Sequence, residues 1–296
     1  MSDTALTISI CNQDGMRATL SPVGAALCEL HVPDSENVSG DVVSSHPSQR
    51  FSGVTVGRVA NRIGKGMFVQ DGELYHLTRN EGNHHLHGGS EAPLGQMLWS
   101  AECSPSSVRF HVQSPDGADG YPGTLDVWSS YSLTDDNTLV MEFKARTDRP
   151  TPVNLTNHTY WNLGGPIQGQ ELQIQANHFA PTDDELIPTG KLEPVAGTDL
   201  DFTRLKALGT RAFDCTFGLD SGAPAATLKD PVTGRCMEVR TTQVALQLFT
   251  TKRALCLEAQ GFPNAVHQES FPSVILHPDK VYTHTTTHRF WNESPR

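Results

Sequence analysis

Polar side chains recur on one face of several strand-like segments. In residues 151–160, alternation places Asn, Thr, His and Tyr together, at positions 154, 156, 158 and 160. In residues 254–260, Glu258 lies on the face opposite two leucines, and in residues 244–249 Gln247 is placed in the same way. A sheet face that carries His, Glu, Gln and Asn could bind a sugar, because such side chains make bidentate hydrogen bonds to hydroxyl groups.

Each of these residues also has an ordinary structural explanation. A single histidine in a strand, such as His158, is more often a hydrogen-bonded structural residue than a functional one. Glu258 could lie at the surface, and Gln247 could lie on the solvent side of an edge strand. Patterning therefore leaves a polar cleft and ordinary polar faces as equal alternatives, and it does not name a reaction.

Residues 83–89 form a second polar cluster, with the sequence Asn-His-His-Leu-His-Gly-Gly. His85 and His87 alternate onto one face, but no HExxH or comparable pattern accompanies them, so we expect no metal site. The two glycines indicate a close backbone approach or a positive φ. Residues 57–66 are glycine-rich and basic, yet they match neither GxGxxG nor GxxxxGK[ST], so we expect no nucleotide cofactor.

Short segments with an apolar residue at every second position must hold these side chains. This pattern predicts half-buried strands at residues 7–10, 107–112, 125–133 and 139–145. Residues 230–234, Asp-Pro-Val-Thr-Gly, lie between two further strand-like runs and predict a hairpin. The whole predicts an all-β protein, a large antiparallel β-sandwich that forms a single domain over residues 1–296.

Two segments do not fit the alternating pattern. Helical periodicity is weak throughout, and its best candidate is a short helical turn at residues 202–208, ended by Gly209. Residues 34–49 are rich in Ser, Asp and Pro and lack periodicity, so we expect a surface loop there.

Composition narrows the class of protein. The 296 residues carry a formal net charge of −11, which argues against nucleic acid and anionic membranes as partners. No apolar run approaches the ~18 residues of a membrane helix, and the N-terminus lacks a signal-peptide pattern, so we expect a cytoplasmic location. The six cysteines are scattered without a CxxC pair, which favours free thiols over disulfides or a zinc site.

Several of these segments resemble the signature motifs of the aldose 1-epimerase (galactose mutarotase) family, in the family's order from about Gly53 to Phe290. The matching segments are residues 57–66, 84–89, 120–123, 154–163, 187–190, 197–202, 256–260 and 271–273, together with Tyr282. Several of these motifs are long and specific. The family fold is a large antiparallel β-sandwich, which agrees with the patterning.

The resemblance implies roles for individual residues. His158 matches the family's general acid and Glu258 matches its general base. The residues matched to sugar contacts are Arg62, His87 (the second active-site histidine), Asp214 and Gln247, with Asn61 as a neighbour that would position Arg62. The resemblance implies that the partner is a small free sugar such as galactose or glucose, and that no cofactor is needed.

Mutarotation, the reaction of this family, opens a cyclic hemiacetal and closes it on the other face. One acid protonates the ring oxygen while one base takes the proton of the C1 hydroxyl, so no metal, nucleotide or covalent intermediate is needed. The expected starting state has Glu258 ionised and His158 protonated, with mutual attraction favouring both charges.

The sequence departs from the family pattern in places. Cys215-Thr216 follow Asp214 where the family often has His-Asn, which leaves the orientation of Asp214 and the preferred sugar open. Asn264 stands where the family usually has Asp. The loop between Gln247 and Glu258 is shorter than usual, which suggests a trimmed rim of the cleft.

Two other functions remain as alternatives. A hexose-6-phosphate 1-epimerase would need further cations, for which Arg58 and Lys65 are candidates. A sugar-binding module without catalysis would be expected to lack the histidine or the glutamate, and both are present. A glycoside hydrolase has less support, because the motifs supply one carboxylate for the anomeric centre. The sequence does not distinguish galactose, glucose or a pentose, nor a monomer from a homodimer.

Overall fold

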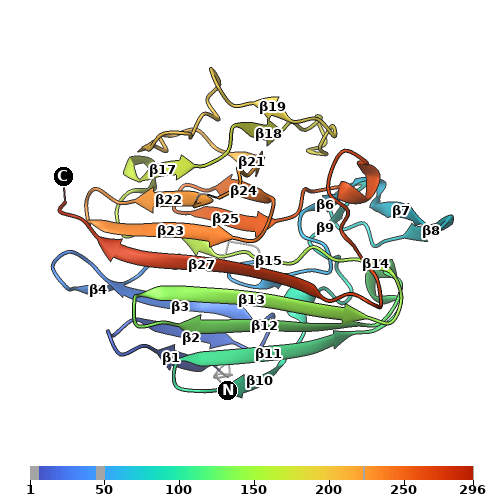
Figure 1. The fold of residues 1–296 in the computed structure, drawn as a ribbon, viewed down its shortest axis with the longest axis horizontal. Coiled ribbons are helices and arrows are strands. Elements are labelled where there is room, and N and C mark those ends of the chain that lie inside the picture. The colour runs from blue at the N-terminus through green and yellow to red at the C-terminus, as the bar shows by residue number, and fades with distance from the viewer. Residues whose placement is uncertain (1–6, 45–50, 223, 296) are drawn as a thin grey trace.

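The computed structural model describes residues 7–44, 51–222 and 224–295, and it is built almost wholly of β-strands (Figure 1). The helical elements among these residues are five short 3-10 turns: η1 (Gly64–Gly66), η2 (Leu94–Gln96), η3 (Ala118–Gly120), η4 (Ile167–Gly169) and η5 (Ala265–His267). Within the described ranges, no helix is long and apolar enough to cross a membrane.

The largest sheet has nine strands. Their order is β10 (Ser100–Cys103), β11 (Ser107–Ser114), β12 (Leu125–Leu133), β13 (Thr138–Thr147), β27 (Tyr282–Asn292), β23 (Arg235–Thr241), β22 (Ala226–Lys229), β17 (Glu171–Ile174) and β20 (Lys206–Ala207). All neighbours in this sheet pair antiparallel. The long strand β27 joins the N-terminal strands to the C-terminal ones.

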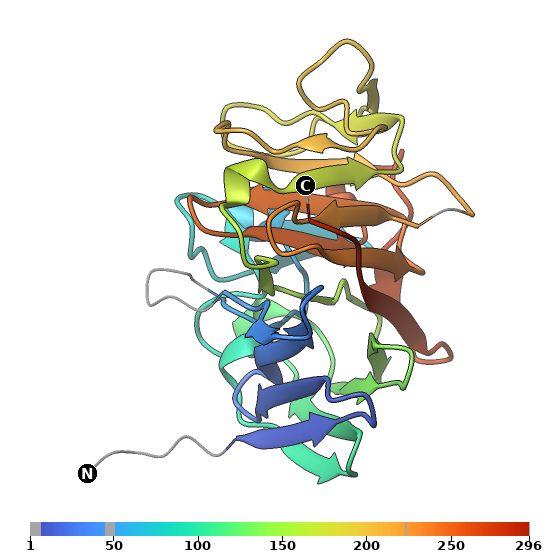
Figure 2. The same cartoon turned by 90° about the vertical axis from the view of Figure 1, so that its left-hand side faces the viewer.

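Two smaller sheets lie behind the large one in Figure 1. One has the order β1 (Ile8–Cys11), β2 (Arg17–Ser21), β3 (Ala26–Pro33) and β4 (Ser39–Asp41). The other has the order β16 (Tyr160–Trp161), β25 (Leu255–Gln260), β24 (Ala245–Thr250), β21 (Asp214–Gly218), β18 (His178–Ala180) and β19 (Glu193–Pro194). Figure 2 shows the N-terminal strands in the lower half and the C-terminal strands in the upper half.

Four pairs of short strands complete the fold. They are β14 (Thr151–Pro152) with β26 (Ile275–Leu276), β15 (Thr156–Asn157) with β5 (Thr55–Val56), β6 (Arg62–Ile63) with β9 (His85–Leu86), and β7 (Met67–Gln70) with β8 (Glu73–His76). All four pairs are antiparallel.

One hydrophobic cluster fills the space between the layers. It takes Leu20 from the four-stranded sheet, Phe110 and Met237 from the nine-stranded sheet, and Leu246 and Leu257 from the six-stranded sheet. The strand alternation explains this burial, because every second residue of β12 is buried along its whole length. The predicted all-β sandwich is confirmed, as are the strands expected within 7–10, 107–112, 125–133 and 139–145 and the hairpin at 230–234.

Predictions for two segments outside the cleft were wrong. Residues 202–208 contain no helix; part of the segment is strand β20, which pairs with β17. The buried Phe202 ring packs edge-on against Phe213, and this tertiary contact outweighs a weak helical pattern. The expected loop at 34–49 includes β4, whose Ser39 pairs with Pro33 of β3. Residues 45–50 of that segment lie outside the described residues.

Candidate active site

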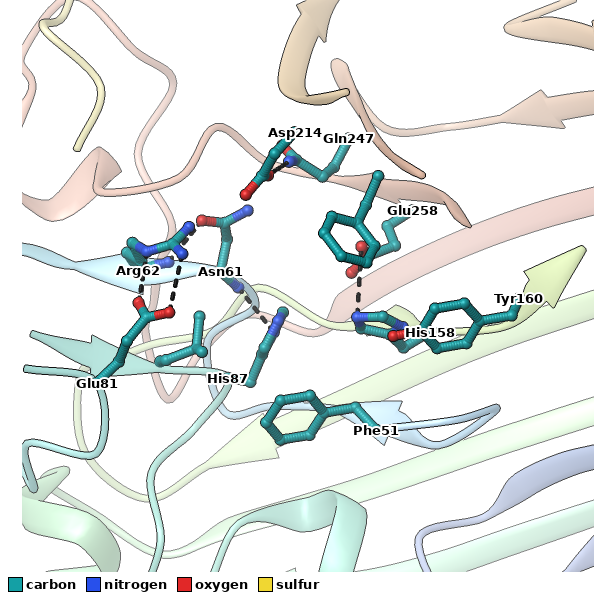
Figure 3. A pocket seen from close by; sticks show the side chains of 12 residues that line it. Phe51, Asn61, Arg62, Glu81, His87, His158, Tyr160, Asp214, Gln247 and Glu258 are labelled. Carbon is teal, nitrogen blue, oxygen red and sulfur yellow. Dashed lines mark hydrogen bonds and ion pairs between the residues drawn. The ribbon is translucent and has the colours of Figure 1, made fainter. Parts of the chain in front are cut away.

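A cleft of about 160 Å³ opens beside the six-stranded sheet (Figure 3). That volume is smaller than the ~300–1,000 Å³ of pockets for drug-sized ligands, which suits one small polar molecule. All seven residues singled out from the sequence line it: Asn61, Arg62, His87, His158, Asp214, Gln247 and Glu258. They come from segments far apart in the chain, and the fold brings them together.

Three neighbouring strands form the floor of the cleft. Gln247 of β24 lies directly opposite Glu258 of β25 and, on its other side, opposite Thr216 of β21. The alternate residues of β25, including Leu257, pack into the core. Glu258 is 2% exposed and Gln247 is 3% exposed. The explanation of Gln247 as the solvent side of an edge strand was therefore wrong, because β24 is an interior strand.

His158 faces Glu258 across the cleft. The distance from His158 Nε2 to Glu258 Oε1 is 3.7 Å, and both side chains are buried. Backbone hydrogen bonds fix the position of the histidine, since its N–H donates to Val54 and its carbonyl accepts from Gly53. The two groups sit close enough for one small molecule to contact both.

The segment around His158 is not the single strand that alternation predicts. Residues 151–160 form three two-residue strands, β14, β15 and β16, which pair with three different partners. Asn154 bonds to the backbone of Gly261, and Thr156 lines a separate internal cavity. Only His158 and Tyr160 of the predicted face reach the cleft.

Burial shifts the pKa values of both groups. Desolvation raises the pKa of Glu258 to about 8, and the nearby charge of Asp214 adds to the rise. Desolvation lowers the pKa of His158 to about 4. Both shifts favour the neutral forms, opposite to the ionised starting state expected from mutual attraction. Between these two pKa values, the pair holds one titratable proton in either arrangement.

A buried thiol contacts the far side of the His158 ring. Cys256 Sγ lies 3.6 Å from His158 Nδ1, and burial raises the pKa of this thiol well above its usual range. The thiol therefore stays protonated and neutral, and its sulfur can accept a weak hydrogen bond from Nδ1–H. In the neutral ring the proton then lies on Nδ1, and Nε2, the nitrogen that faces Glu258, is free to take up and release a proton.

The backbone orients the His87 ring. The N–H of Asn61 donates to His87 Nδ1 over 3.2 Å, so the proton of the neutral ring lies on Nε2. His87, His158 and Glu258 offer atoms within 4.8 Å of one another, a spacing that could hold a metal ion. A metal at His87 Nε2 would require the ring proton to move to Nδ1, where it would face the N–H of Asn61. This set of side chains therefore suits hydrogen bonds to hydroxyl oxygens better.

Arg62 forms an ion pair with Glu81, a residue that no sequence pattern indicated. Its Nε lies 2.6 Å and its Nη2 2.9 Å from the two carboxylate oxygens of Glu81. Asn61 holds the same segment, because its side-chain oxygen accepts the N–H of Arg62 over 2.9 Å. Asn61 thus fixes the backbone at Arg62, and it also lines the cleft.

Asp214 and Gln247 form a second polar wall. Gln247 Nε2 donates to Asp214 Oδ1 over 2.5 Å, while the Thr216 hydroxyl donates to Gln247 Oε1. Thr216, one of the two residues that depart from the family pattern, therefore helps to orient Asp214 through Gln247. Cys215 alternates to the other face of β21 and lines a different pocket.

Aromatic rings close the apolar side of the cleft. The ring centroid of Phe51 lies 4.7 Å from that of His87 and 5.9 Å from that of His158. The ring centroid of Tyr160 lies 5.1 Å from that of His158. Phe249 also lines the cleft. Such rings offer contact for the C–H faces of a sugar, while the polar walls meet its hydroxyl groups.

Glu81, Phe51 and Phe249 were not predicted from the sequence. Glu81 belongs to a turn, where residue spacing carries no information about direction. Phe51 follows the undescribed residues 45–50 and has a positive φ of 60°. Phe249 lies two residues after Gln247 on the same strand, so the alternation of 244–249 could have identified it.

The glycine-rich motifs form the scaffold behind the cleft. A Cβ at Gly88 would lie 1.7 Å from the carbonyl oxygen of Gly57, and one at Gly89 would lie 2.1 Å from Asp119. Both glycines have positive φ, as the sequence indicated. His85 is not a cleft residue, because its ring bonds to Tyr121 and to the backbone of Thr78. These contacts hold the loop that presents His87.

The family profile for aldose 1-epimerase matches residues 6–289. The chain is 37% identical to galactose mutarotase from Sus scrofa over 92% of this chain and 90% of that protein. It is 35% identical to aldose 1-epimerase from Haemophilus influenzae over 82% and 78%. The crystal structure of an aldose epimerase homologue from C. elegans superposes with a TM-score of 0.92, at 30% identity, covering 97% of this chain and 99% of that one.

Proposed function

Because the chain belongs to the aldose 1-epimerase family and is an isomerase acting on sugars, we propose that it interconverts the α and β anomers of a free aldohexose. Galactose and glucose are the first substrates to consider. His158 is the general acid and Glu258 the general base. The observation that carries this assignment is the 3.7 Å approach of His158 Nε2 to Glu258 Oε1 inside a buried, polar cleft.

Ring opening uses both groups at once. Glu258 takes the proton from the C1 hydroxyl, the C1–O1 bond becomes a carbonyl, and the C1–O5 bond breaks. The ring oxygen receives its proton from His158 Nε2. The products are an open-chain aldehyde, a protonated Glu258 and a neutral His158, so charge and protons balance without any further reactant.

Closure reverses these steps on the other face of the aldehyde. After rotation about C1–C2, the O5 hydroxyl returns its proton to His158 and attacks C1. The aldehyde oxygen takes the proton back from Glu258, which gives the opposite anomer. The pair ends with the single proton that it began with, in agreement with the one-proton state between the two pKa values.

Substrate binding would favour the charged arrangement of that pair. Burial alone favours neutral Glu258 and neutral His158. A sugar hydroxyl that donates to the carboxylate, and a ring oxygen that accepts from the imidazolium, stabilise the two charges by hydrogen bonds. The proton thus moves from Glu258 to His158 when the sugar is bound, which prepares the acid and the base together.

The remaining cleft residues hold the sugar. His87 Nε2 and Arg62 supply donors, Asp214 supplies acceptors, and Gln247 supplies both, which matches the mixed character of hydroxyl groups. Asn61 fixes the backbone beside Arg62 and the ring of His87. These contacts set the orientation of the anomeric carbon between His158 and Glu258, and precise orientation lowers the barrier of the proton transfers.

The two alternatives have less support at this cleft. A hexose-6-phosphate epimerase needs additional cations near the sugar. The guanidinium of Arg58 is not available for this, because it donates hydrogen bonds to oxygens of Ser114, Pro115 and Pro122. Lys65 does not line the cleft. A pure binding module would not need a buried His–Glu pair that is costly to desolvate.

Polarimetry on freshly dissolved α-D-galactose and α-D-glucose tests the proposal. The protein should speed the approach to the same final rotation, and Glu258→Gln should lower the catalysed rate by at least ~10²-fold while binding persists. His158→Asn should be impaired to a similar degree. His84→Ala is the control, because its ring lies in the scaffold and bonds to the Lys65 backbone. Equal damage from His84→Ala, or near-normal turnover in Glu258→Gln, would contradict the assignment.

We further propose that the protein works in the cytoplasm as a monomer or a homodimer. The six cysteines, all among the described residues, are free thiols, which suits a reducing compartment. Light scattering after size-exclusion chromatography measures the oligomeric state, and a mass above that of a dimer would overturn that part of the proposal.

A further inference from the structure

We propose that Glu81 is a specificity-determining residue, which restricts the cleft to uncharged sugars by occupying its one arginine. This inference rests on the proposed function of the cleft. Glu81 is not a catalytic residue, and it lies on the side of the cleft away from Glu258 and His158 (Figure 3).

The ion pair has the geometry of a fixed unit. Both carboxylate oxygens of Glu81 bind Arg62, one to Nε and one to Nη2, at 2.6 and 2.9 Å. The Arg62 side chain is 10% exposed and that of Glu81 is 35% exposed. A bidentate pair of this kind is directional and stronger than a single contact. The two donors that an incoming phosphate or carboxylate would bind best are therefore already used.

The backbone holds both partners in place. Arg62 belongs to β6, which pairs with Leu86 of β9. Glu81 begins the turn that leads into β9, and its N–H and carbonyl are both hydrogen-bonded to the backbone of His84. The ion pair thus connects the two ends of one small backbone unit. It does not depend on two freely moving surface side chains.

The other charges that line the cleft explain why the Arg62–Glu81 ion pair would disfavour an anionic sugar. Among the described lining residues, Arg62 is the single Lys or Arg, whereas Glu81 and Asp214 are carboxylates. The His158–Glu258 pair is neutral as a unit near pH 7, because it holds one proton. Glu81 therefore cancels the positive charge of Arg62, and a hexose phosphate or a hexuronate would enter without a free counter-charge.

The same ion pair can still form hydrogen bonds with an uncharged sugar. Arg62 keeps the hydrogens of Nη1 for donation, and the Glu81 oxygens keep lone pairs that can accept. A hydroxyl group both donates and accepts, so it can bond to both members of the ion pair. A carboxylate or a phosphate only accepts, so it can use the donors of Arg62 but is repelled by the Glu81 carboxylate. Glu81 thereby converts a potential anion site into a hydroxyl site.

The variant Glu81→Gln tests this role, because it removes the charge with little change in shape. We would measure kcat/KM by polarimetry for D-glucose, D-glucuronate and D-glucose 6-phosphate, with the spontaneous rates subtracted. The ratio of each anionic sugar to glucose should rise at least ~10-fold, since Arg62 regains free donors and the cleft loses a negative charge. Glu185→Gln is the matched control: it removes one carboxylate that pairs with His84 and does not line the cleft.

An unchanged ratio in Glu81→Gln, or the same change in Glu185→Gln, would overturn the role of Glu81. Calorimetric binding of the three sugars to both variants gives the same ratio without turnover, and melting temperatures show whether Glu81→Gln is folded. If the wild-type protein accelerates no sugar, the proposed function fails; the binding ratio still decides whether Glu81 rejects anions.

Discussion

His158 and Glu258 hold one titratable proton between them over a range of about four pH units. Burial creates this range by lowering the pKa of the histidine to about 4 and raising that of the glutamate to about 8. Below the lower value, both groups are protonated and no base is present. Above the upper value, both are deprotonated and no acid is present.

A pH profile tests this at the residue scale. The kcat/KM of mutarotation should be flat near neutral pH and should fall below pH about 4 and above pH about 8, the two pKa values of the pair. The catalysed rate is obtained by subtracting the spontaneous rate at each pH. A single limb near pH ~6.5, the ordinary value for histidine, would show that His158 titrates as an exposed group and that burial does not govern the pair.

The thiol behind His158 gives a second prediction. Cys256→Ala removes the sulfur that accepts from Nδ1–H, so the Nδ1–H tautomer loses this partner and kcat should fall about 10-fold. Cys256→Ser keeps an acceptor at this position and should retain most activity. Nitrogen-15 NMR of labelled histidine reads the tautomer directly and separates this effect from a loss of folding. Equal activity and equal tautomer populations in both variants would contradict the positioning role of Cys256.

At the scale of elements, the motifs that identify the family mostly build the support of the cleft. Arg58 is buried and uses all three guanidinium nitrogens on oxygens of Ser114, Pro115, Pro122 and Thr151. These bonds anchor the segment that continues to Asn61 and Arg62. The motif thus carries one arginine that is buried in the scaffold and another that lines the cleft, and the residue type alone does not distinguish them.

Replacement of Arg58 by Met should therefore be costly. It leaves several buried carbonyl oxygens without donors, and each such group costs roughly 1–3 kcal/mol. Urea denaturation should show the free energy of unfolding reduced by at least ~3 kcal/mol. The matched control is Arg240→Met on β23, whose side chain is 56% exposed and should change stability by less than ~1 kcal/mol. Similar small losses in both variants would show that the Arg58 network is dispensable.

At the scale of the whole molecule, two layers of sheet determine which thiols meet solvent. Cys11 and Cys103 are exposed on outer strands, whereas Cys236 and Cys256 are buried between layers or under the cleft. None of the six cysteines, which all fall in the described ranges, is in a disulfide. The stability of the fold therefore comes from its core and not from cross-links.

Alkylation followed by mass spectrometry tests this distribution. Cys11 and Cys103 should react with iodoacetamide in the native protein, and Cys236 and Cys256 should react only after unfolding. Dithiothreitol should leave the melting temperature unchanged, because no bond is available for it to reduce. Rapid native labelling of Cys256 would show that the strand carrying Glu258 opens far more readily than its burial indicates.

Local pattern alone determined the strands and one hairpin. Period-two alternation marks one buried face, so residues 125–133 and 139–145 were recognised as strands without knowledge of their partners. The same rule failed where the chain changes partners every few residues, as in 151–160. It failed again at 202–208, because the burial of Phe202 against a distant phenylalanine outweighs helix propensity.

The residues of the cleft were named by their motifs, but only the tertiary structure decided their environment. A motif preserves residue type, so His158, Glu258 and Arg62 were recognised in the sequence. Their pKa shifts, the thiol behind His158 and the carboxylate on Arg62 arise from contacts across large sequence separations. Desolvation and charge interaction depend on distance in space, which no spacing along the chain encodes. Glu81 is the clearest case, because its carboxylate reaches Arg62 only when β6 pairs with β9.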